Sequence, residues 1–568
     1  MPIFAQTFKK CAMIQDDLVK FYENSFKKNW DYPAFTDYND KSSYTYSQVA
    51  EKIAELHLLF DAFHIKPDSK ITLIGRNTPN WCVCALAVLT HGSTLVPILQ
   101  DFKASDVQHI VNHSDSELFF CSDTIWETIE EGAIENVRGI FSLTDFGLLQ
   151  QRDRKKVEAI LNMLPELKAK KYPEGFNKDC VEYAPYDKNK VALINYTSGT
   201  TGFSKGVMLT ANNLAGNVRF ALDTELIKPR SNHLSFLPLA HAYGCAFDFL
   251  YTTSIGCHIT LLGRTPSPKT LLQALDETKP EIVLMVPLII EKLYRKNIVP
   301  ALEKGAAKVL KTIPVVNGVV FSKVRKQLIK TFGGQLREVI IGGAALNQEV
   351  EDFLRKIKFP YTVGYGMTEC GPIISYSANE KFVKNSAGMI IKNHMEVRID
   401  SVDPYNIVGE IQVHGEHVMV GYYKNEQATE EVFTKDKWLK TGDMGTIDAE
   451  GNIFIRGRCK NMILGSSGQN IYPEELEAKL NNMPFVMESL VFEKAGKLIA
   501  LVYPDFELLD SSGFTQKDLP TIMDENLKNF NETESNYQNI AQIRLYPNEF
   551  EKTPKKSIKR YLYSSIAE

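Results

Sequence analysis

The stretch Ile194-Asn-Tyr-Thr-Ser-Gly-Thr-Thr-Gly-Phe-Ser-Lys-Gly-Val-Met-Leu209 is the most informative part of this chain. Seven of the eight residues from Thr197 to Ser204 are Thr, Ser or Gly, and Lys205 follows them. The apolar runs on either side predict a strand, a hydroxyl-rich loop and then further regular structure. Because Gly199 and Gly202 tolerate positive φ, such a loop can turn backbone N–H groups and hydroxyls toward phosphate oxygens. We infer that it binds a nucleoside triphosphate.

The loop is not a Walker A motif, which requires Gly, four residues and then Gly-Lys-Ser/Thr. In this chain Ser204 precedes Lys205 and Gly206 follows it. An isolated Gly- and Thr-rich cluster is more often a surface turn with a solvated lysine. The density of hydroxyls between two apolar segments, and the motifs further along the chain, favour phosphate binding.

Length and composition limit the classes of protein to consider. The chain has 568 residues, which suggests roughly two to four domains with a large buried core. Its net charge of −4 argues against a nucleic-acid-binding protein. The nine cysteines include no Cys-x-x-Cys pair, which argues against zinc. We find no signal peptide and no apolar window of ~18 residues, so we expect a cytoplasmic protein and leave peripheral membrane contact open.

Alternating apolar strands and helices predict a wound, mostly parallel sheet in the first part of the chain. Residues 13–62 are expected to form helices on either side of a short polar stretch at 37–43. The expected strands begin near residues 71, 95, 117, 139, 258 and 282, and residues 82–91 form an apolar helix. A basic stretch at 304–330 is expected to be helical, with a break near Pro314 and Gly318. After residue 380, short strands alternate with turns, and from about residue 459 the chain resembles a compact α+β unit.

Five further motifs follow the phosphate-binding loop along the chain. They carry a histidine in a Pro- and Gly-bounded loop, a tight turn without side-chain bulk, a turn with an aromatic, a hydroxyl and a carboxylate, a lone carboxylate and a guanidinium. In order they are Phe236-Leu-Pro-Leu-Ala-His-Ala-Tyr-Gly244, Ile340-Ile-Gly-Gly-Ala-Ala345, Tyr365-Gly-Met-Thr-Glu-Cys-Gly-Pro372, Lys440-Thr-Gly-Asp443 and Ile455-Arg-Gly-Arg458.

These six motifs, in this order, resemble the adenylate-forming (ANL) superfamily, and most of all its long-chain fatty acid–CoA ligases. The resemblance extends from about Tyr32 to Arg560. It implies an α/β fold with a large N-terminal domain (1–458) of wound α/β subdomains plus a small β region, and a small mobile α+β lid (459–568) that hinges near Lys460. It also implies that ATP, Mg²⁺ and coenzyme A are used to convert a fatty acid into acyl-AMP and then acyl-CoA.

The resemblance further assigns a role to each motif residue. The triphosphate is held by Thr197, Ser198, Gly199, Thr200, Thr201, Gly202 and Lys205. Adenine lies against Gly343 and Ala344, with Tyr365 stacked on it and Gly366 in the same turn. Thr368 touches the α-phosphate, and Glu369 and Thr201 hold Mg²⁺. Asp443 accepts both ribose hydroxyls, and Arg458 reaches the ribose or a phosphate. His241 flanks the substrate carboxylate, and Ser467-Gly468-Gln469 borders the pantetheine channel.

Two positions depart from the family pattern. Ser204 stands where the family usually has Pro, which should change only the stiffness of the loop. More seriously, Ser557 stands where the family carries the lysine that contacts the carboxylate and α-phosphate during adenylation. Lys556 is one residue earlier. A one-residue slip, such as a bulge, would place its side chain where the family lysine lies, whereas a regular strand would point it to the opposite side. We therefore count Lys556 with Lys205, His241, Thr368 and Glu369 as the catalytic set.

The substrate class is less closely defined by the sequence. An amino-acid-activating enzyme would need an Asp for the substrate ammonium, and Asp248 is the only nearby candidate. An aryl acid, or transfer to acyl-carrier protein in place of CoA, remains an alternative. Because of Ser557, so does an ATP-binding protein that has lost adenylation.

Overall fold

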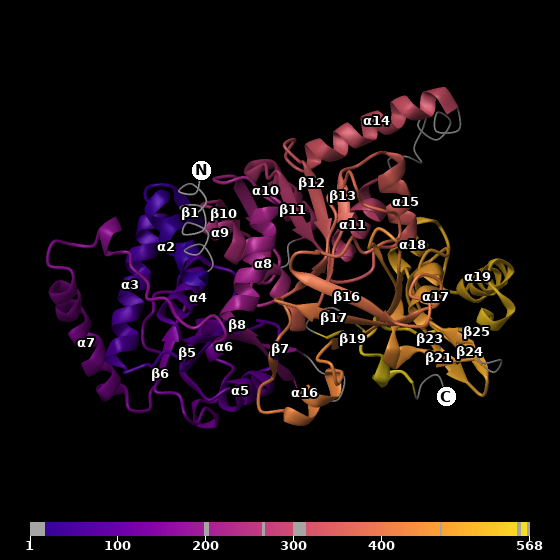
Figure 1. The fold of residues 1–568 in the computed structure, drawn as a ribbon. Coiled ribbons are helices and arrows are strands. Elements are labelled where there is room, and N and C mark those ends of the chain that lie inside the picture. Colours follow the sequence, from indigo (N-terminus) through magenta and orange to yellow (C-terminus); the bar gives the residue numbers. More distant parts are fainter. Residues whose placement is uncertain are drawn as a thin grey trace, which may run out of the picture.

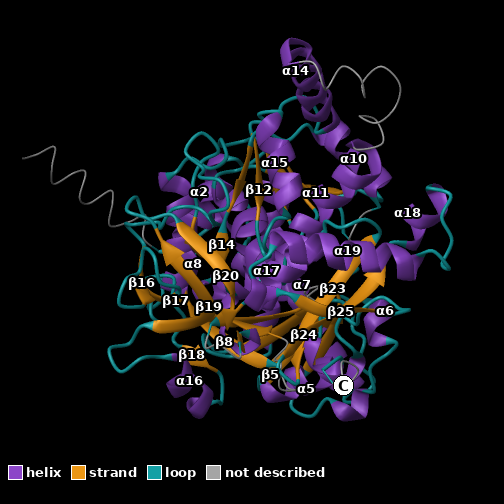
Figure 2. Cartoon of the chain, turned by 90° about the vertical axis from the view of Figure 1, so that its right-hand side faces the viewer, coloured by secondary structure: helices purple, strands orange, loops and turns teal. Residues whose placement is uncertain are grey.

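A computed structural model of the chain describes residues 17–197, 204–263, 267–298, 314–465, 469–553 and 558–564. Figure 1 shows wound α/β layers in the N-terminal and middle parts and a smaller α+β unit at the C-terminal end. Figure 2 shows the strands as several separate sheets with helices packed between and around them.

The largest sheet contains seven strands, ordered β18-β8-β7-β4-β3-β5-β6. Pairing is parallel from β6 through β7, and β8 and β18 join antiparallel at the edge. Buried apolar side chains fill these strands, as parallel strands covered on both faces require. The strands are β3 (Lys70–Ile74), β4 (Thr94–Ile98), β5 (Ser116–Cys121), β6 (Gly139–Ser142), β7 (Val191–Thr197), β8 (Lys205–Thr210) and β18 (Gly421–Tyr422).

Two smaller sheets continue the α/β architecture. One has the order β2-β1-β10-β9 and the other the order β11-β12-β13. Their strands are β1 (Pro33–Asp37), β2 (Ser43–Thr45), β9 (Asn232–Ser235), β10 (His258–Leu261), β11 (Ile282–Met285), β12 (Glu338–Ile341) and β13 (Tyr361–Val363). In the second of these sheets β12 pairs in parallel with both β11 and β13, so all three strands end on the same side.

Helices cover these sheets and connect their strands. The apolar helix α4 is buried over almost its whole length, and it begins at a Thr78 cap followed by Pro79. The helices are α2 (Leu18–Lys28), α3 (Tyr46–Ala62), α4 (Pro79–His91), α5 (Ala104–His113), α6 (Asp123–Trp126), α7 (Arg154–Lys171), α8 (Ala211–Asp223), α9 (Thr252–Ser254), α10 (Pro268–Thr278), α11 (Pro287–Leu293), α14 (Pro314–Thr331), α15 (Gln348–Lys356) and α16 (Glu426–Val432). None of the described helices combines the length and apolar composition that a membrane crossing needs.

The last part of the chain forms an antiparallel sheet and then a unit with its own core. The sheet has the order β16-β17-β19-β20, from β16 (Met395–Asp400), β17 (Gly409–Gly415), β19 (Leu439–Ile447) and β20 (Ile453–Arg458). The C-terminal unit combines β23 (Val486–Lys494), β24 (Lys497–Pro504) and β25 (Ile540–Leu545) with α17 (Pro473–Leu480), α18 (Phe506–Ser511) and α19 (Leu519–Thr533). Its hydrophobic core is separate from the main one. The predicted fold class is therefore confirmed.

Two local predictions differ from the structure. The polar stretch at 37–43 was expected between helices, but it is the turn of the β1–β2 hairpin. The expected break at Gly318 is absent, and α14 is continuous from Pro314 to Thr331. A proline is tolerated at the first turn of a helix, and one internal glycine costs only about 1 kcal/mol, so neither interrupts the helix.

Candidate active site

The predicted phosphate-binding motif begins within β7 and ends within β8. Thr197 at the end of β7 pairs with Lys205 at the start of β8, so these two residues lie side by side at one edge of the sheet. Lys205 extends over the Tyr422 ring, with its Nζ 4.9 Å from the ring centroid. The predicted loop residues Ser198, Gly199, Thr200, Thr201 and Gly202 lie outside the described residues.

Glu369 lies close to this edge of the sheet, in the short helix η5 (Thr368–Cys370). The Tyr422 hydroxyl donates a hydrogen bond of 3.0 Å to Glu369 Oε1, and the Met419 N–H donates one of 2.8 Å to the Glu369 carbonyl oxygen. Burial raises the pKa of Tyr422, so its hydroxyl stays protonated and able to donate. Tyr422 therefore links Lys205 to Glu369, and Thr368 is buried beside them.

A second group of polar side chains centres on the buried Asp443 in β19. The Tyr365 hydroxyl donates to Asp443 Oδ2 at 2.6 Å, and Arg458 on the neighbouring β20 donates to Asp443 Oδ1, also at 2.6 Å. Asp443 and Arg458 are direct cross-strand partners. Burial raises the pKa of Asp443, and the opposing influence of Arg458 and Tyr365 only partly offsets it. Glu369 also acts electrostatically on Asp443, so the two groups of side chains are neighbours.

Glycines form the backbone turns expected to face adenine. Gly343 follows β12 with φ of 90°, a conformation that favours glycine. A side chain at Gly366, in β14 (Tyr365–Gly366), would collide with the carbonyl oxygen of Pro372, before β15 (Ile373–Ser375). Ala344 lies beside Gly343, beyond the end of the strand.

His241 lies in the loop between β9 and the helix η3 (Gly244–Tyr251). Its Nδ1 accepts a 3.3 Å hydrogen bond from the Tyr243 N–H. Asn195 on β7 holds this loop in place, because its side chain donates a hydrogen bond of 2.8 Å to the Ala240 carbonyl. The Tyr243 hydroxyl donates to the Ile340 carbonyl at 3.0 Å, so this loop packs against the end of β12.

Asp248, the candidate for binding a substrate ammonium, lies in the core. Its two oxygens contact His233 Nε2 at 2.7 Å and the Ser235 hydroxyl at 3.3 Å. The His233 and Asp248 side chains are each only 1% exposed. Because Asp248 lies inside the core and is paired with an equally buried histidine, it is not placed to hold a substrate amine.

The C-terminal candidates are only partly described. Gly468 and Lys556 lie outside the described residues. Lys460 is exposed in the short helix η6 (Cys459–Asn461), next to the end of β20. Lys559, another lysine near Ser557, forms an ion pair of 2.5 Å with Glu551. The short strands β21 (Ile463–Leu464) and β22 (Asn470–Ile471) flank Gly468.

Tyr422 is the site residue that sequence reasoning missed. It reaches the site because β18 pairs antiparallel with β8, which sets Tyr422 opposite Val207. Only a two-residue strand carries this long-range pairing, and no local pattern predicts it. The Gly421-Tyr-Tyr sequence after an apolar run was the available signal, but it does not indicate a partner.

Comparison with known proteins shows the fold and the family of the chain. The fold is shared with solved adenylate-forming enzymes: o-succinylbenzoate coenzyme A synthetase (MenE) from Bacillus subtilis, in complex with ATP and magnesium ion, is 19% identical with a TM-score of 0.71, over 95% of this chain and 98% of that one. The model of the AMP-binding enzyme family matches residues 22–423, and the chain belongs to this family.

Curated relatives extend over most of the chain. The long-chain-fatty-acid–CoA ligase FadD15 of Mycobacterium bovis is 26% identical over 91% of this chain and 89% of its own length. Long chain acyl-CoA synthetase 1 of Arabidopsis thaliana is 29% identical over 83% of this chain and 76% of its own length.

Proposed function

We propose that this protein is a fatty acid–CoA ligase that works through an acyl-adenylate. The observation that carries the proposal is the meeting of two groups of side chains, Lys205–Tyr422–Glu369 and Tyr365–Asp443–Arg458, at one edge of the wound sheet. The first group suits the phosphates and metal of MgATP, and the second suits its ribose. The curated relatives named above support the fatty acyl substrate.

In the first half-reaction a fatty carboxylate attacks the α-phosphorus of MgATP, which gives acyl-AMP and pyrophosphate. Glu369 offers a carboxylate, the hard oxygen ligand that Mg²⁺ prefers, and Tyr422 orients it. Lys205 and Thr368 would contact phosphate oxygens, and His241 would flank the carboxylate. The Mg²⁺ of the substrate neutralises phosphate charge. The protein contributes orientation and a prearranged electrostatic environment.

In the second half-reaction the CoA thiol attacks the acyl carbon and AMP leaves, so the thioester forms as the acyl–phosphate bond breaks. One site must serve both reactions, so we propose that the lid (459–568) rotates about Lys460 relative to residues 1–458. The Gly468 loop would then border the pantetheine. Lys556 would serve adenylation, in place of the lysine that the family has at the position of Ser557.

The acyl class is favoured over amino acids because Asp248 is buried and bonded to His233 and Ser235. An aryl acid as the substrate, or acyl-carrier protein as the acceptor in place of CoA, would use the same chemistry. The assay below distinguishes both alternatives from a fatty acid–CoA ligase. Exposed Lys323, Lys326 and Lys330 on α14 are the feature that a peripheral contact with acidic lipid would use. The cytoplasmic location stays a prediction.

The proposal is tested by incubating the purified chain with ATP, Mg²⁺ and CoA, and with palmitate, benzoate or no acid. Mass spectrometry should detect palmitoyl-CoA and AMP in a one-to-one ratio only with palmitate. A thioester from benzoate alone would give the aryl alternative. Acyl-AMP without acyl-CoA, converted to thioester when holo acyl-carrier protein is added, would give the carrier-protein alternative.

A further inference from the structure

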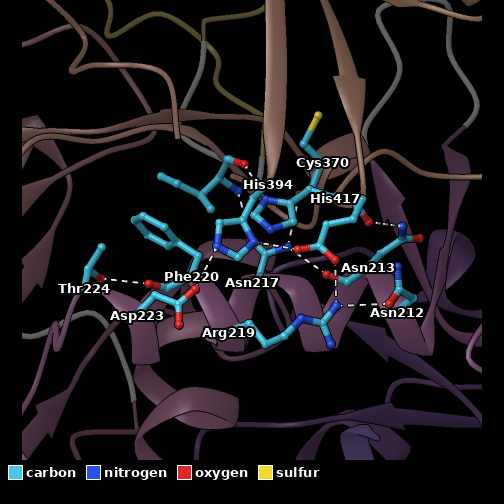
Figure 3. Close-up of polar contacts among 12 residues, drawn as sticks. Asn212, Asn213, Asn217, Arg219, Phe220, Asp223, Thr224, Cys370, His394 and His417 are labelled. Atoms are coloured by element: carbon cyan, nitrogen blue, oxygen red, sulfur yellow. Dashed lines mark hydrogen bonds and ion pairs between the residues drawn. The ribbon is translucent and has the colours of Figure 1, made fainter. Parts of the chain in front are cut away.

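Two histidines and a glutamate form a cluster behind the Glu369 turn that the proposed reaction does not use. His394 precedes β16, while Glu416 and His417 directly follow β17, and all three pack against α8. One possible ligand atom from each of the three lies within 4.8 Å of the other two. Figure 3 shows the imidazoles of His394 and His417 side by side near Cys370, with Arg219 and Asp223 of α8 close by. Their ring centroids are 5.5 Å apart.

Each of the three side chains is oriented by a partner outside the cluster. The Nδ1 of His417 donates to the Ile373 carbonyl at 2.9 Å, and the Nε2 of His394 contacts Asp223 Oδ2 at 3.3 Å. Arg219 donates to Glu416 Oε2 at 2.6 Å. The atoms that these outer partners do not use are His417 Nε2, His394 Nδ1 and Glu416 Oε1. Outer partners of this kind, a carboxylate or a carbonyl on the far nitrogen of an imidazole, fix the ring and tautomer in metal sites.

His417 supplies the observation that points to a ligand. Its side chain is fully buried, and its Nε2 has no hydrogen-bond partner among the described residues. Because a carbonyl can only accept, Nδ1 carries the hydrogen. The Gly216 backbone also acts on the ring, but Nε2 makes no hydrogen bond of acceptable geometry and presents a lone pair. An unsatisfied polar atom at such depth costs free energy, and native proteins rarely keep one without a purpose. Burial also lowers the pKa of His417 to about 4, in keeping with a neutral ring.

A glycine on α8 provides the space that the cluster occupies, and solvent can reach the cluster from the opposite side. Gly216 on α8 lies so close that an added Cβ would be 2.8 Å from His417 Cδ2 and 3.0 Å from Glu416 Cδ. The helix therefore approaches the two side chains only because residue 216 is glycine. On the other side, Asp223 is 66% exposed and Glu416 26% exposed, so solvent reaches the cluster there.

We propose that His394, Glu416 and His417 bind a divalent cation of the zinc class, through His394 Nδ1, Glu416 Oε1 and His417 Nε2. Two imidazoles and one carboxylate are a usual donor set for Zn²⁺, whereas Mg²⁺ prefers oxygen ligands and water. The lack of paired cysteines argues against a thiolate zinc site, but this site needs none. His394 Nδ1 and Glu416 Oε1 are now 2.5 Å apart, joined by a hydrogen bond. The cation would replace that proton, which leaves to solvent.

The location gives the ion a structural role beside the proposed active site. One contact of the cluster and two of its neighbours reach the Glu369 turn. His417 donates to the Ile373 carbonyl, Asn217 of α8 accepts from the Ile373 N–H at 3.1 Å, and the Met419 N–H donates to the Glu369 carbonyl. A bound cation would tie α8 to the ends of β16 and β17, and so hold the backbone from which Glu369 projects.

Zinc binding to the full-length protein tests the proposal, with ATP and Mg²⁺ absent. After treatment with a chelator and its removal, the chain is titrated with ZnCl₂ in a calorimeter, and retained zinc is counted by elemental analysis. We expect one tight equivalent and a thermal midpoint raised by several degrees at saturation. His417→Asn keeps an amide donor for the Ile373 carbonyl but deletes Nε2, so it should lose this equivalent.

The matched control is His414→Asn, the same substitution three residues away at an exposed position on β17. It should bind zinc like the wild type, and so should Glu369→Gln, which excludes the Mg²⁺ site. Asp223→Asn removes only an outer partner and should weaken binding roughly tenfold. If the wild type and His417→Asn take up zinc with the same affinity and number, or if the wild type takes up none, the proposal fails. The cluster would then be only a hydrogen-bonded network of His394, Glu416 and Arg219.

Discussion

At the scale of single residues, the site combines side chains that motifs identify with one that only the fold reveals. Glu369, Asp443 and Arg458 each lie in a short, dense pattern of unusual residues, so they could be predicted from the sequence. Their neighbour Tyr422 could not, because its contact with Glu369 depends on pairing between strands more than 200 residues apart. The loop residues 198–202 are identified by sequence alone, since they lie outside the described residues.

Glu369 and Tyr422 give a graded pair of variants. Glu369→Gln removes the charge proposed to bind Mg²⁺ and keeps the volume, so acyl-AMP formation should be abolished while the fold is retained. Tyr422→Phe removes one hydrogen bond to a carboxylate, worth about 1.5–3 kcal/mol, and keeps the ring beneath Lys205, so the rate should fall roughly tenfold or more. Pyrophosphate release measures both. Near wild-type release by Glu369→Gln would remove Glu369 from the metal site.

Asp443 should make ATP binding sensitive to pH. Burial raises the pKa of this carboxyl, and accepting hydrogen bonds from both ribose hydroxyls requires its ionised form. ATP should therefore bind with full affinity at a pH well above the raised pKa of Asp443, and the affinity should fall as the pH drops through that pKa. The loss should begin at a higher pH than it would if the carboxyl were exposed and had an ordinary pKa. Asp443→Asn should bind ATP more weakly at neutral pH, by about 1.5–3 kcal/mol per lost charged hydrogen bond, and without this pH dependence.

The control for this prediction is the Michaelis constant for the fatty acid, followed over the same pH range. Wild type and Asp443→Asn should have the same profile for the acid. An ATP profile that is identical in the two proteins would show that another group titrates.

At the scale of elements, strands with continuous apolar runs were predictable, because a strand buried on both faces leaves a clear signal. The β1–β2 hairpin was not, since its polar turn at 37–43 lies between two strong helices. The start of α14 at Pro314 follows a local rule, but the continuity of that helix through Gly318 does not. Tertiary packing decides such cases, and one glycine is a weak local signal.

The link between β20 and the C-terminal unit carries a prediction about motion. Lys460→Pro locks φ at the proposed hinge, and a locked φ cannot absorb a rotation between two states. Adenylation and thioester formation should then be impaired unequally. The first is measured by pyrophosphate release from ATP, and the second by CoA consumption with preformed acyl-AMP. Equal losses in both would place the pivot elsewhere.

At the scale of the whole molecule, six motifs in a fixed order sufficed to predict the fold class and the family. The way in which the C-terminal unit docks could not be predicted. It rests on side chains from distant elements: Arg295 donates to the Asn481 carbonyl at 2.8 Å, and Asn347 to Asn482 at 2.5 Å. Such contacts depend on surface shape and leave no periodic signal in the sequence.

The C-terminal lysines test whether the proposed lid takes part in adenylation. If Lys556 replaces the family lysine, Lys556→Ala should slow adenylation by roughly 10²–10³ and spare thioester formation from acyl-AMP, since a contact to the transition state is lost. Lys555→Ala is the internal control, because adjacent side chains on an extended segment point to opposite sides. If both variants adenylate normally, Lys556 has no such role, and Lys559→Ala tests the remaining lysine.

The central claim is that this chain adenylates a fatty acid. The most direct measurement is exchange of labelled pyrophosphate into ATP, because it reports adenylation and needs no thiol acceptor. With Mg²⁺ present, the account predicts exchange that depends on palmitate and disappears in Glu369→Gln. No exchange with palmitate or with other fatty acids, from a folded protein that binds ATP, would contradict the account and leave an ATP-binding protein that has lost adenylation.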